Sequence, residues 1–160
     1  MHWQKIALVG VGLLGGSLGL ALRQRRLAGR VEGYVRRAVS IAECERRGVV
    51  DQAGLDLAAV VREADLGILS GPLAQMRGLA ERLAPALKPD ATVTDVGSVK
   101  ASVVADLETL IAHAGGHFVG SHPMAGAEKV GVQWARADLF GMRVVDPIWR
   151  RRAEGESLRG

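Results

Sequence analysis

A glycine-rich turn between two apolar stretches is the feature that most constrains the fold of this chain. Lys5 to Val9 is a short run of β-compatible residues, and residues 10–17 read GVGLLGGS before a helical stretch that reaches about Arg26. The glycines follow the spacing G-x-G-x-x-G, which alone is a weak motif. In its strand-turn-helix setting the first glycine permits the tight turn, the second lets the backbone approach a pyrophosphate, and the third lets helix and strand pack closely. The candidate cofactor-binding residues of this turn are Gly10, Gly12, Leu13, Leu14 and Gly15.

The turn predicts a dinucleotide site, because phosphates bind well at the positive N-terminus of a helix. A glycine-rich turn that serves packing alone is the alternative.

Strand and helix patterns alternate along the rest of the chain. We expect strands at residues 31–35, 66–69, 91–94 and 118–120, and helices at residues 38–47, 57–63, 73–87 and 100–114. Gly29 is expected to end the first helix and Gly48 the second. Connections long enough to hold a helix favour a parallel sheet covered on both faces. The sequence therefore predicts an α/β fold, a doubly wound Rossmann-type sheet, over residues 1–145.

The last residues, 146–160, are polar and arginine-rich and have no apolar period, so we expect a frayed tail. At 160 residues with 48% hydrophobic content, the chain predicts one domain. Its longest apolar stretch, Ile6 to Leu22, is broken by glycines and a serine, which fits neither a membrane span nor a signal peptide. We expect a cytoplasmic protein. The single cysteine, Cys44, stands among charged residues and is interpreted as a helix side chain rather than a nucleophile.

The net charge of +4 raises the question of nucleic-acid binding. The arginines that produce it stand in three places, at residues 23–26, 36–37 and 150–152. One Tyr, two Phe and three Trp provide no interleaved aromatic platform for bases, and no zinc-finger spacing occurs. We therefore expect neither a nucleic-acid partner nor a metal site, and interpret most of these charges as solvated helix faces.

The end of the second predicted strand bears on the choice of cofactor. NAD enzymes usually carry an acid there, about twenty residues past the glycine motif, which accepts hydrogen bonds from the ribose hydroxyls. This chain has Val35 at that point, followed by Arg36 and Arg37. No carboxylate repels a 2′-phosphate, and the two guanidinium groups could pair with one. NADP is therefore favoured over NAD, although two solvated arginines beside an NAD site remain the alternative.

Two further loops follow predicted strands, at the edge where open α/β sheets bind ligands. His122 precedes Pro123, which favours an extended backbone for the histidine, and its ordinary pKa suits acid-base work. From the residues alone, a structural histidine and a catalytic one are equally compatible with this pattern. Ser98 precedes a predicted helix, so it could be an N-cap, a ligand contact or both. Lys100 could meet an anion or lie in solvent.

Three blocks together resemble the prephenate and arogenate dehydrogenase family. They are GVGLLGGS at residues 10–17, DVGSVK at residues 95–100 and GSHPMAGAEK at residues 120–129, the last followed by Asp138-Leu139-Phe140. Many dehydrogenases share the first block, whereas the second and third together are specific to this family. The resemblance covers nearly all of residues 5–145.

The resemblance implies oxidative decarboxylation of a cyclohexadienyl acid, with hydride transfer to NAD or NADP, on the way to tyrosine. It implies that His122 is the catalytic histidine at the substrate's C4 hydroxyl and that Ser98 supports both that histidine and the substrate. Gly71 and Pro72 would line the nicotinamide side by the same resemblance. Family members continue into a helical domain that makes a homodimer, and we expect this chain to be a form without it.

Two other hypotheses remain open at this level. The chain could be an idle NAD(P)-binding fragment or sensor, or a dehydrogenase of the β-hydroxyacid type. The sequence does not distinguish prephenate from arogenate as the substrate.

Overall fold

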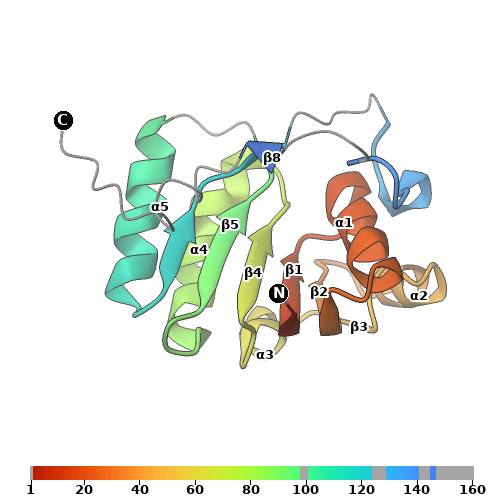
Figure 1. The fold of residues 1–160 in the computed structure, drawn as a ribbon, viewed down its shortest axis with the longest axis horizontal. Coiled ribbons are helices and arrows are strands. Elements are labelled where there is room, and N and C mark those ends of the chain that lie inside the picture. Colours follow the sequence, from red (N-terminus) through yellow and green to blue (C-terminus); the bar gives the residue numbers. More distant parts are fainter. Residues whose placement is uncertain (1, 98–100, 124–128, 141–144, 147–160) are drawn as a thin grey trace.

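The computed structural model of the protein describes residues 2–97, 101–123, 129–140 and 145–146, and its centre is a six-stranded sheet. The strand order is β3-β2-β1-β4-β5-β6, and every neighbouring pair in this sheet is parallel (Figure 1). The strands are β1 Trp3–Val9, β2 Ala28–Tyr34, β3 Gln52–Gly54, β4 Leu66–Leu69, β5 Thr92–Asp95 and β6 His117–Val119. This is the doubly wound Rossmann-type sheet that the alternating pattern predicted.

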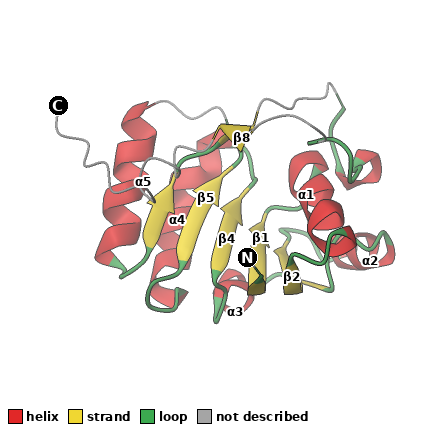
Figure 2. Ribbon diagram, in the orientation of Figure 1, coloured by secondary structure: helices red, strands yellow, loops and turns green. Residues whose placement is uncertain are grey.

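Helices and short turns connect the strands. The helices are α1 Leu13–Gln24, α2 Val39–Arg46, α3 Leu57–Val61, α4 Met76–Leu83 and α5 Ala101–His113. Single turns of 3-10 helix occur at η1 Leu73–Gln75, η2 Ala84–Ala86 and η3 Val132–Trp134. A small antiparallel ribbon pairs β7 His122–Pro123 with β8 Val145–Asp146. Helices and strands form three layers, with the sheet in the middle (Figure 2).

Two separate apolar cores cover the two faces of the sheet. Alternate residues of β1 point to opposite faces, so Ala7 and Val9 lie in one core and Ile6 and Leu8 in the other. The first core contains apolar side chains of α3, α4 and α5 and the buried ring of Phe118. The second contains those of α1 and α2, including Cys44, which is completely buried. Burial raises the pKa of the Cys44 thiol, as expected for a packed helix side chain rather than a nucleophile.

Three local expectations were wrong or incomplete. Gly29 does not end the first helix: α1 ends at Gln24, Arg26 takes a positive φ of 53° in the turn, and Gly29 lies inside β2. A Cβ on Gly29 would lie 3.0 Å from the carbonyl oxygen of Gln4, so a larger residue there would crowd the neighbouring strand β1.

The helix expected over residues 73–87 is broken into η1, α4 and η2. Pro85 lies in η2 and has no amide hydrogen to continue an α-helix, which explains the change to a 3-10 turn. We also predicted no strand at residues 52–54, where β3 forms the edge of the sheet.

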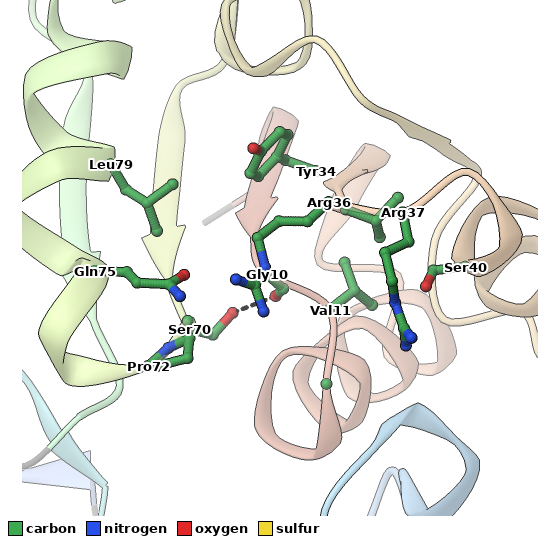
Figure 3. Close-up of a pocket in the computed structure, with 13 residues that line it drawn as sticks. Gly10, Val11, Tyr34, Arg36, Arg37, Ser40, Ser70, Pro72, Gln75 and Leu79 are labelled. Atoms are coloured by element: carbon green, nitrogen blue, oxygen red, sulfur yellow. Dashed lines mark hydrogen bonds between the residues drawn. The ribbon is translucent and has the colours of Figure 1, made fainter.

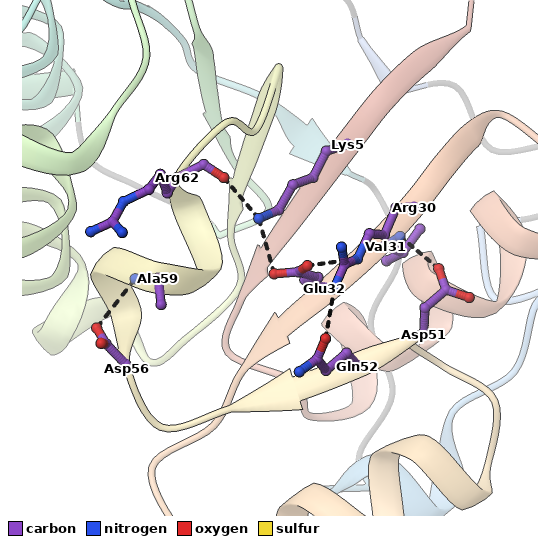
Figure 4. A network of polar contacts seen from close by, with 9 residues as sticks. All are labelled: Lys5, Arg30, Val31, Glu32, Asp51, Gln52, Asp56, Ala59 and Arg62. Carbon is purple, nitrogen blue, oxygen red and sulfur yellow. Dashed lines mark hydrogen bonds and ion pairs between the residues drawn. The ribbon is translucent and has the colours of Figure 1, made fainter.

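A polar network crosses the face of the sheet between β1 and β2, away from the carboxyl-end edge (Figure 4). The carboxylate of Glu32, which is 8% exposed, pairs with Lys5 Nζ at 3.0 Å and Arg30 Nε at 2.7 Å. Lys5 Nζ also donates to the carbonyl oxygen of Arg62 at 2.8 Å. The network therefore neutralises a buried carboxylate and ties the end of α3 to β1. Within the described residues, no helix is both long and apolar enough to span a bilayer.

Candidate functional site

A crevice lies at the carboxyl end of β1, between its two neighbours β2 and β4. The chain runs from β1 to β2 on one side and returns to β4 on the other, which makes this the topological switch point of the sheet. The crevice has a cavity volume of about 190 Å³ and is open to solvent along one side. Its lining residues are Gly10, Val11, Gly12, Tyr34, Val35, Arg36, Arg37, Ser40, Ser70, Gly71, Pro72, Gln75 and Leu79. Figure 3 shows this crevice with the glycine turn at its floor.

The three motif glycines meet different constraints in the structure. Gly10 has a φ of +98°, and a Cβ there would lie 2.9 Å from the amide nitrogen of Gly71. A Cβ on Gly15 would lie 2.3 Å from the carbonyl oxygen of Gly10, so the close approach of α1 to the turn requires a glycine. Nothing described lies within 4 Å of a Cβ built on Gly12. That open side is the one from which a phosphate could approach the backbone.

The N-terminus of α1 faces the same turn. Gly12 is its N-cap and contributes no capping side chain, and the first turn contains no acidic residue. The first intrahelical hydrogen bond runs from the amide of Gly16 to the carbonyl oxygen of Gly12 at 2.9 Å. The amides of Leu13, Leu14 and Gly15 come before it and have no partner within the helix. These donors and the helix dipole favour an anion at this point.

The residues after β2 form the other end of the crevice. Val35, which is 5% exposed, occupies the position at which NAD enzymes usually carry a ribose-binding acid. Arg36 and Arg37 are both exposed, and both line the crevice. In Figure 3 the Arg36 side chain reaches back toward Gly10 and Ser70, whereas Arg37 extends along the side that carries Ser40. Two positive charges thus flank this end, and the lining contains no carboxylate.

The structure adds residues that the sequence had not singled out. Ser70, at the end of β4, donates from Oγ to the carbonyl oxygen of Gly10 at 2.5 Å. Gln75 and Leu79 line the side of the crevice away from Arg37, and Tyr34 lines it as well (Figure 3). The Tyr34 hydroxyl accepts from Arg82 Nη2 at 3.3 Å. Ser70 directly follows β4 and Tyr34 is the last residue of β2. That position was the available signal for these two residues, because ligands of such sheets bind beyond the carboxyl ends of the strands.

A second cluster lies at the carboxyl ends of β5 and β6. Asp95, 1% exposed, accepts the amide of Gly97 at Oδ2 and the amide of Ser121 at Oδ1, both at 3.1 Å. The hydroxyl of Ser121 also donates to the carbonyl oxygen of Asp95. Asp95 therefore joins the loops that lead to the two candidate catalytic residues. The backbone of His122 is extended in β7 and pairs with Asp146, as Pro123 predicted. Ser98 and Lys100 lie outside the described residues.

The segment after the His122 loop packs beside α1 (Figure 1). The buried hydroxyl of Ser17 accepts the amide of Arg136 at 3.0 Å. A Cβ on Gly16 would lie 3.0 Å from side-chain carbons of both Val132 and Ala135. The segment at residues 132–136 therefore packs against α1, the helix that begins at the glycine turn. Contacts thus connect the part of the chain that follows the His122 loop to the helix at the crevice.

Comparison with known proteins gives the family. The family model for the nucleotide-binding domain of prephenate dehydrogenase matches residues 18–145. A prephenate dehydrogenase of Lactococcus lactis is 34% identical over 139 residues, 86% of this chain and 38% of that protein. A cyclohexadienyl dehydrogenase of Zymomonas mobilis is 35% identical over 139 residues, 86% of this chain and 46% of that protein. The chain thus spans less than half the length of these curated relatives.

Solved structures agree with this result. A prephenate dehydrogenase from A. aeolicus, in complex with hydroxyphenyl propionate and NAD+, matches with a TM-score of 0.81 and 35% identity over 89% of this chain and 49% of its own. A Synechocystis arogenate dehydrogenase matches with a TM-score of 0.77 and 34% identity over 85% of this chain and 46% of its own.

The β-hydroxyacid type of dehydrogenase is represented by the Mycobacterium tuberculosis 3-hydroxyisobutyrate dehydrogenase. Its TM-score is 0.69 but its identity only 19%, a likeness in fold alone. The family model, by contrast, is that of the prephenate dehydrogenase nucleotide-binding domain and covers 128 residues, from 18 to 145. This chain therefore belongs to the prephenate dehydrogenase family and has the fold of its nucleotide-binding domain.

Proposed function

We propose that this chain binds NAD or NADP in the crevice at Gly10–Gly15 and serves as the nucleotide-binding part of a prephenate or arogenate dehydrogenase. The observation that carries the proposal is the glycine turn, whose open side at Gly12 faces a crevice at the switch point of the sheet. Family membership supports the reaction class.

The described residues fit a dinucleotide. A pyrophosphate at the turn would accept hydrogen bonds from the first amides of α1, with no side-chain cap or acidic residue in competition. An adenosine would lie between the residues after β2 and the wall of Gln75 and Leu79. Gly71 and Pro72 line the crevice beyond the end of β4, toward β5, where a nicotinamide ring would extend.

The cofactor preference that we propose is NADP. It rests on Val35 in place of an acid and on the charges of Arg36 and Arg37 at the adenosine end. Guanidinium groups bind phosphate oxygens through paired, charge-assisted hydrogen bonds. A ribose 2′-phosphate in this position would also meet the Ser40 hydroxyl, which lines the same side.

In the proposed reaction the protein orients the acid and moves one proton. The bound nicotinamide supplies the hydride acceptor. His122 takes the proton of the C4 hydroxyl as the C4 hydride leaves, and Ser98 supports the histidine and the substrate. The bond from C1 to the carboxylate then breaks, carbon dioxide leaves, and the electron pair completes an aromatic ring with its charge on the C4 oxygen. That oxygen takes the proton back from His122 to become a phenol. Asp95 contributes indirectly, because it holds the residue before His122.

Turnover with each pair of substrates tests this proposal. The purified chain is incubated with prephenate or arogenate and with NAD or NADP, and both reduced cofactor and released carbon dioxide are measured. We expect dinucleotide binding by calorimetry, and carbon dioxide equal to reduced cofactor wherever turnover occurs. Binding without turnover of either acid would leave an idle nucleotide-binding module as the better description. Reduction without carbon dioxide would contradict the proposed reaction class.

A further inference from the structure

Ser70 fixes the carbonyl group of the first motif glycine. The residue follows β4, and its amide donates to the carbonyl oxygen of Val9 at 3.0 Å, which continues the sheet pairing past the end of the strand. This places the side chain over the glycine turn, where Oγ donates to the Gly10 carbonyl oxygen at 2.5 Å (Figure 3). The contact joins residues that are 60 positions apart.

The same carbonyl oxygen is enclosed from the other side by α1. A Cβ on Gly15 would lie 2.3 Å from that oxygen and 2.6 Å from Ser70 Oγ. The peptide after Gly10 is thus held between the first turn of α1 and the end of β4. Gly10 has no Cβ, which gives its backbone wide conformational freedom and allows its positive φ of 98°. The serine hydroxyl restricts that freedom.

The orientation of the Gly10 peptide determines where Val11 and Gly12 lie. Gly12 in turn is the N-cap of α1 and presents the open side of the turn. A rotated Gly10 peptide would displace the helix amides from a bound pyrophosphate, and preorganised donors bind an anion more tightly than mobile ones. Ser70 also lines the crevice, but we attribute its effect to its hydrogen bond with the turn and not to direct contact with the dinucleotide.

We infer that Ser70 is a positioning residue for dinucleotide binding: its hydroxyl holds the glycine turn in the conformation that receives the pyrophosphate. The inference rests on the proposed function, because it concerns the same crevice. It assigns a role to a residue outside the glycine motif, contributed by a different strand.

The test compares Ser70→Ala with Thr94→Val in the 160-residue chain. Thr94 is the matched control, because its Oγ1 also donates to a backbone carbonyl at the end of a strand, that of Val119 at 2.6 Å, but does not line the crevice. Each variant loses one hydroxyl and one hydrogen bond. Affinities for NAD and NADP are measured by calorimetry, and amide hydrogen exchange of the free protein is followed at Gly10 and Gly16, which donate to Tyr34 and Gly12.

We expect Ser70→Ala to raise the Kd of both dinucleotides by about 3- to 10-fold, the range for one lost neutral hydrogen bond. Exchange at Gly10 and Gly16 rises in the same variant. Thr94→Val leaves both the Kd and these exchange rates unchanged while lowering Tm by a similar amount. This difference separates positioning from a general loss of stability.

If Ser70→Ala changes neither the Kd of the dinucleotides nor the exchange rates, the inference is wrong. Dinucleotide binding by the parent chain would still support the proposed function in that case. A parent chain that binds neither NAD nor NADP would overturn the proposed function. In that case exchange at Gly10 still decides whether Ser70 holds the turn, and equal rates in parent and variant contradict it.

Discussion

The carboxylate of Asp95 accepts the backbone amide of Ser121 at 3.1 Å, so the end of β5 holds the residue that immediately precedes His122. Its other oxygen accepts the amide of Gly97, at the start of the loop that leads to Ser98. A single buried side chain thus connects two loops that are distant in the sequence. Such a carboxylate has little freedom to move without breaking one of the two contacts.

Replacement of Asp95 by Asn should expose this dependence. The amide group of Asn offers one acceptor oxygen, so its NH2 would face a backbone donor. We expect the free energy of unfolding to fall by about 1–3 kcal/mol, the usual cost of a buried donor left unsatisfied. Urea denaturation measures it. Asp106→Asn, at a surface residue that pairs with Arg77 at 3.6 Å, should change stability little. Equal stability of Asp95→Asn and the parent would contradict the role given to Asp95.

Two glycines should respond in opposite directions to replacement by alanine. In Gly15→Ala the new methyl group meets the Gly10 carbonyl oxygen, which is backbone and cannot swing away. We expect a loss of about 1–3 kcal/mol in unfolding free energy and much weaker dinucleotide binding. Gly78→Ala lies in α4 with nothing described within 4 Å of its Cβ, so it should stabilise the chain by about 0.5–1 kcal/mol. Thermal unfolding of both variants decides, and a stabilised Gly15→Ala would contradict the tight packing of the turn.

Acid stability should depend on Asp65. The side-chain hydrogen bond from Lys88, with backbone donors at Lys5 and Gln4, holds the pKa of Asp65 below its ordinary value of 3.8. A carboxyl whose pKa is lower in the folded than in the unfolded protein stabilises the fold above the unfolded pKa, and this contribution disappears as pH falls through the folded pKa. We therefore expect Tm to fall as the solution is acidified below about pH 4.

In Asp65→Asn that part of the pH dependence is absent, because no group titrates at this position. Scanning calorimetry between about pH 2 and 7 measures the difference in slope between parent and variant. Glu63→Gln, an exposed neighbour, is the control for loss of a carboxylate. An identical slope in parent and Asp65→Asn would show that Asp65 contributes nothing to acid stability.

The cofactor preference depends on the arginines after β2. Arg36→Ala should weaken NADP binding by about 1–3 kcal/mol, the range for a charge-assisted hydrogen bond, and leave NAD nearly unchanged. Titration calorimetry with both dinucleotides measures the ratio. Arg25→Ala removes the same charge after the far end of α1 and should not change that ratio. If the unmodified chain binds NAD more tightly than NADP, the preference proposed here is wrong.

The sequence predicted the strands whose residues are apolar and bounded by turn residues. The expected range 66–69 coincides with β4, whose short apolar run lies between Asp65 and the Ser70-Gly71-Pro72 turn. The edge strand β3 was missed because Gln52, Ala53 and Gly54 include no β-branched or aromatic residue. Its pairing with β2 comes from the position of the chain after α2 rather than from local preference.

The crevice was only partly predictable for a similar reason. Of the residues expected at a cofactor site, Gly10, Gly12, Arg36, Arg37, Gly71 and Pro72 line one crevice. Leu13, Leu14 and Gly15 were expected there too but are not among its lining residues. A serine after a strand carries no local sign of its hydrogen-bond acceptor, so the contact from Ser70 to Gly10 needed the packed sheet to be seen. The same holds for the two backbone amides at Asp95.

His122 is the residue on which the proposed chemistry depends most directly. In His122→Asn the side chain can still hydrogen-bond, but it cannot take a proton from the C4 hydroxyl. We expect kcat to fall by about 10²–10⁴-fold, the range for loss of a positioned acid-base group, with little change in the Kd of the dinucleotide. The control is His117→Asn in β6. His117 is exposed and its Nε2 lies 3.5 Å from Oδ1 of Asp90, so this change should leave kcat unaltered. Steady-state kinetics and calorimetry on the two variants separate chemistry from binding, and a kcat of His122→Asn within a few-fold of the parent would remove this histidine from the mechanism.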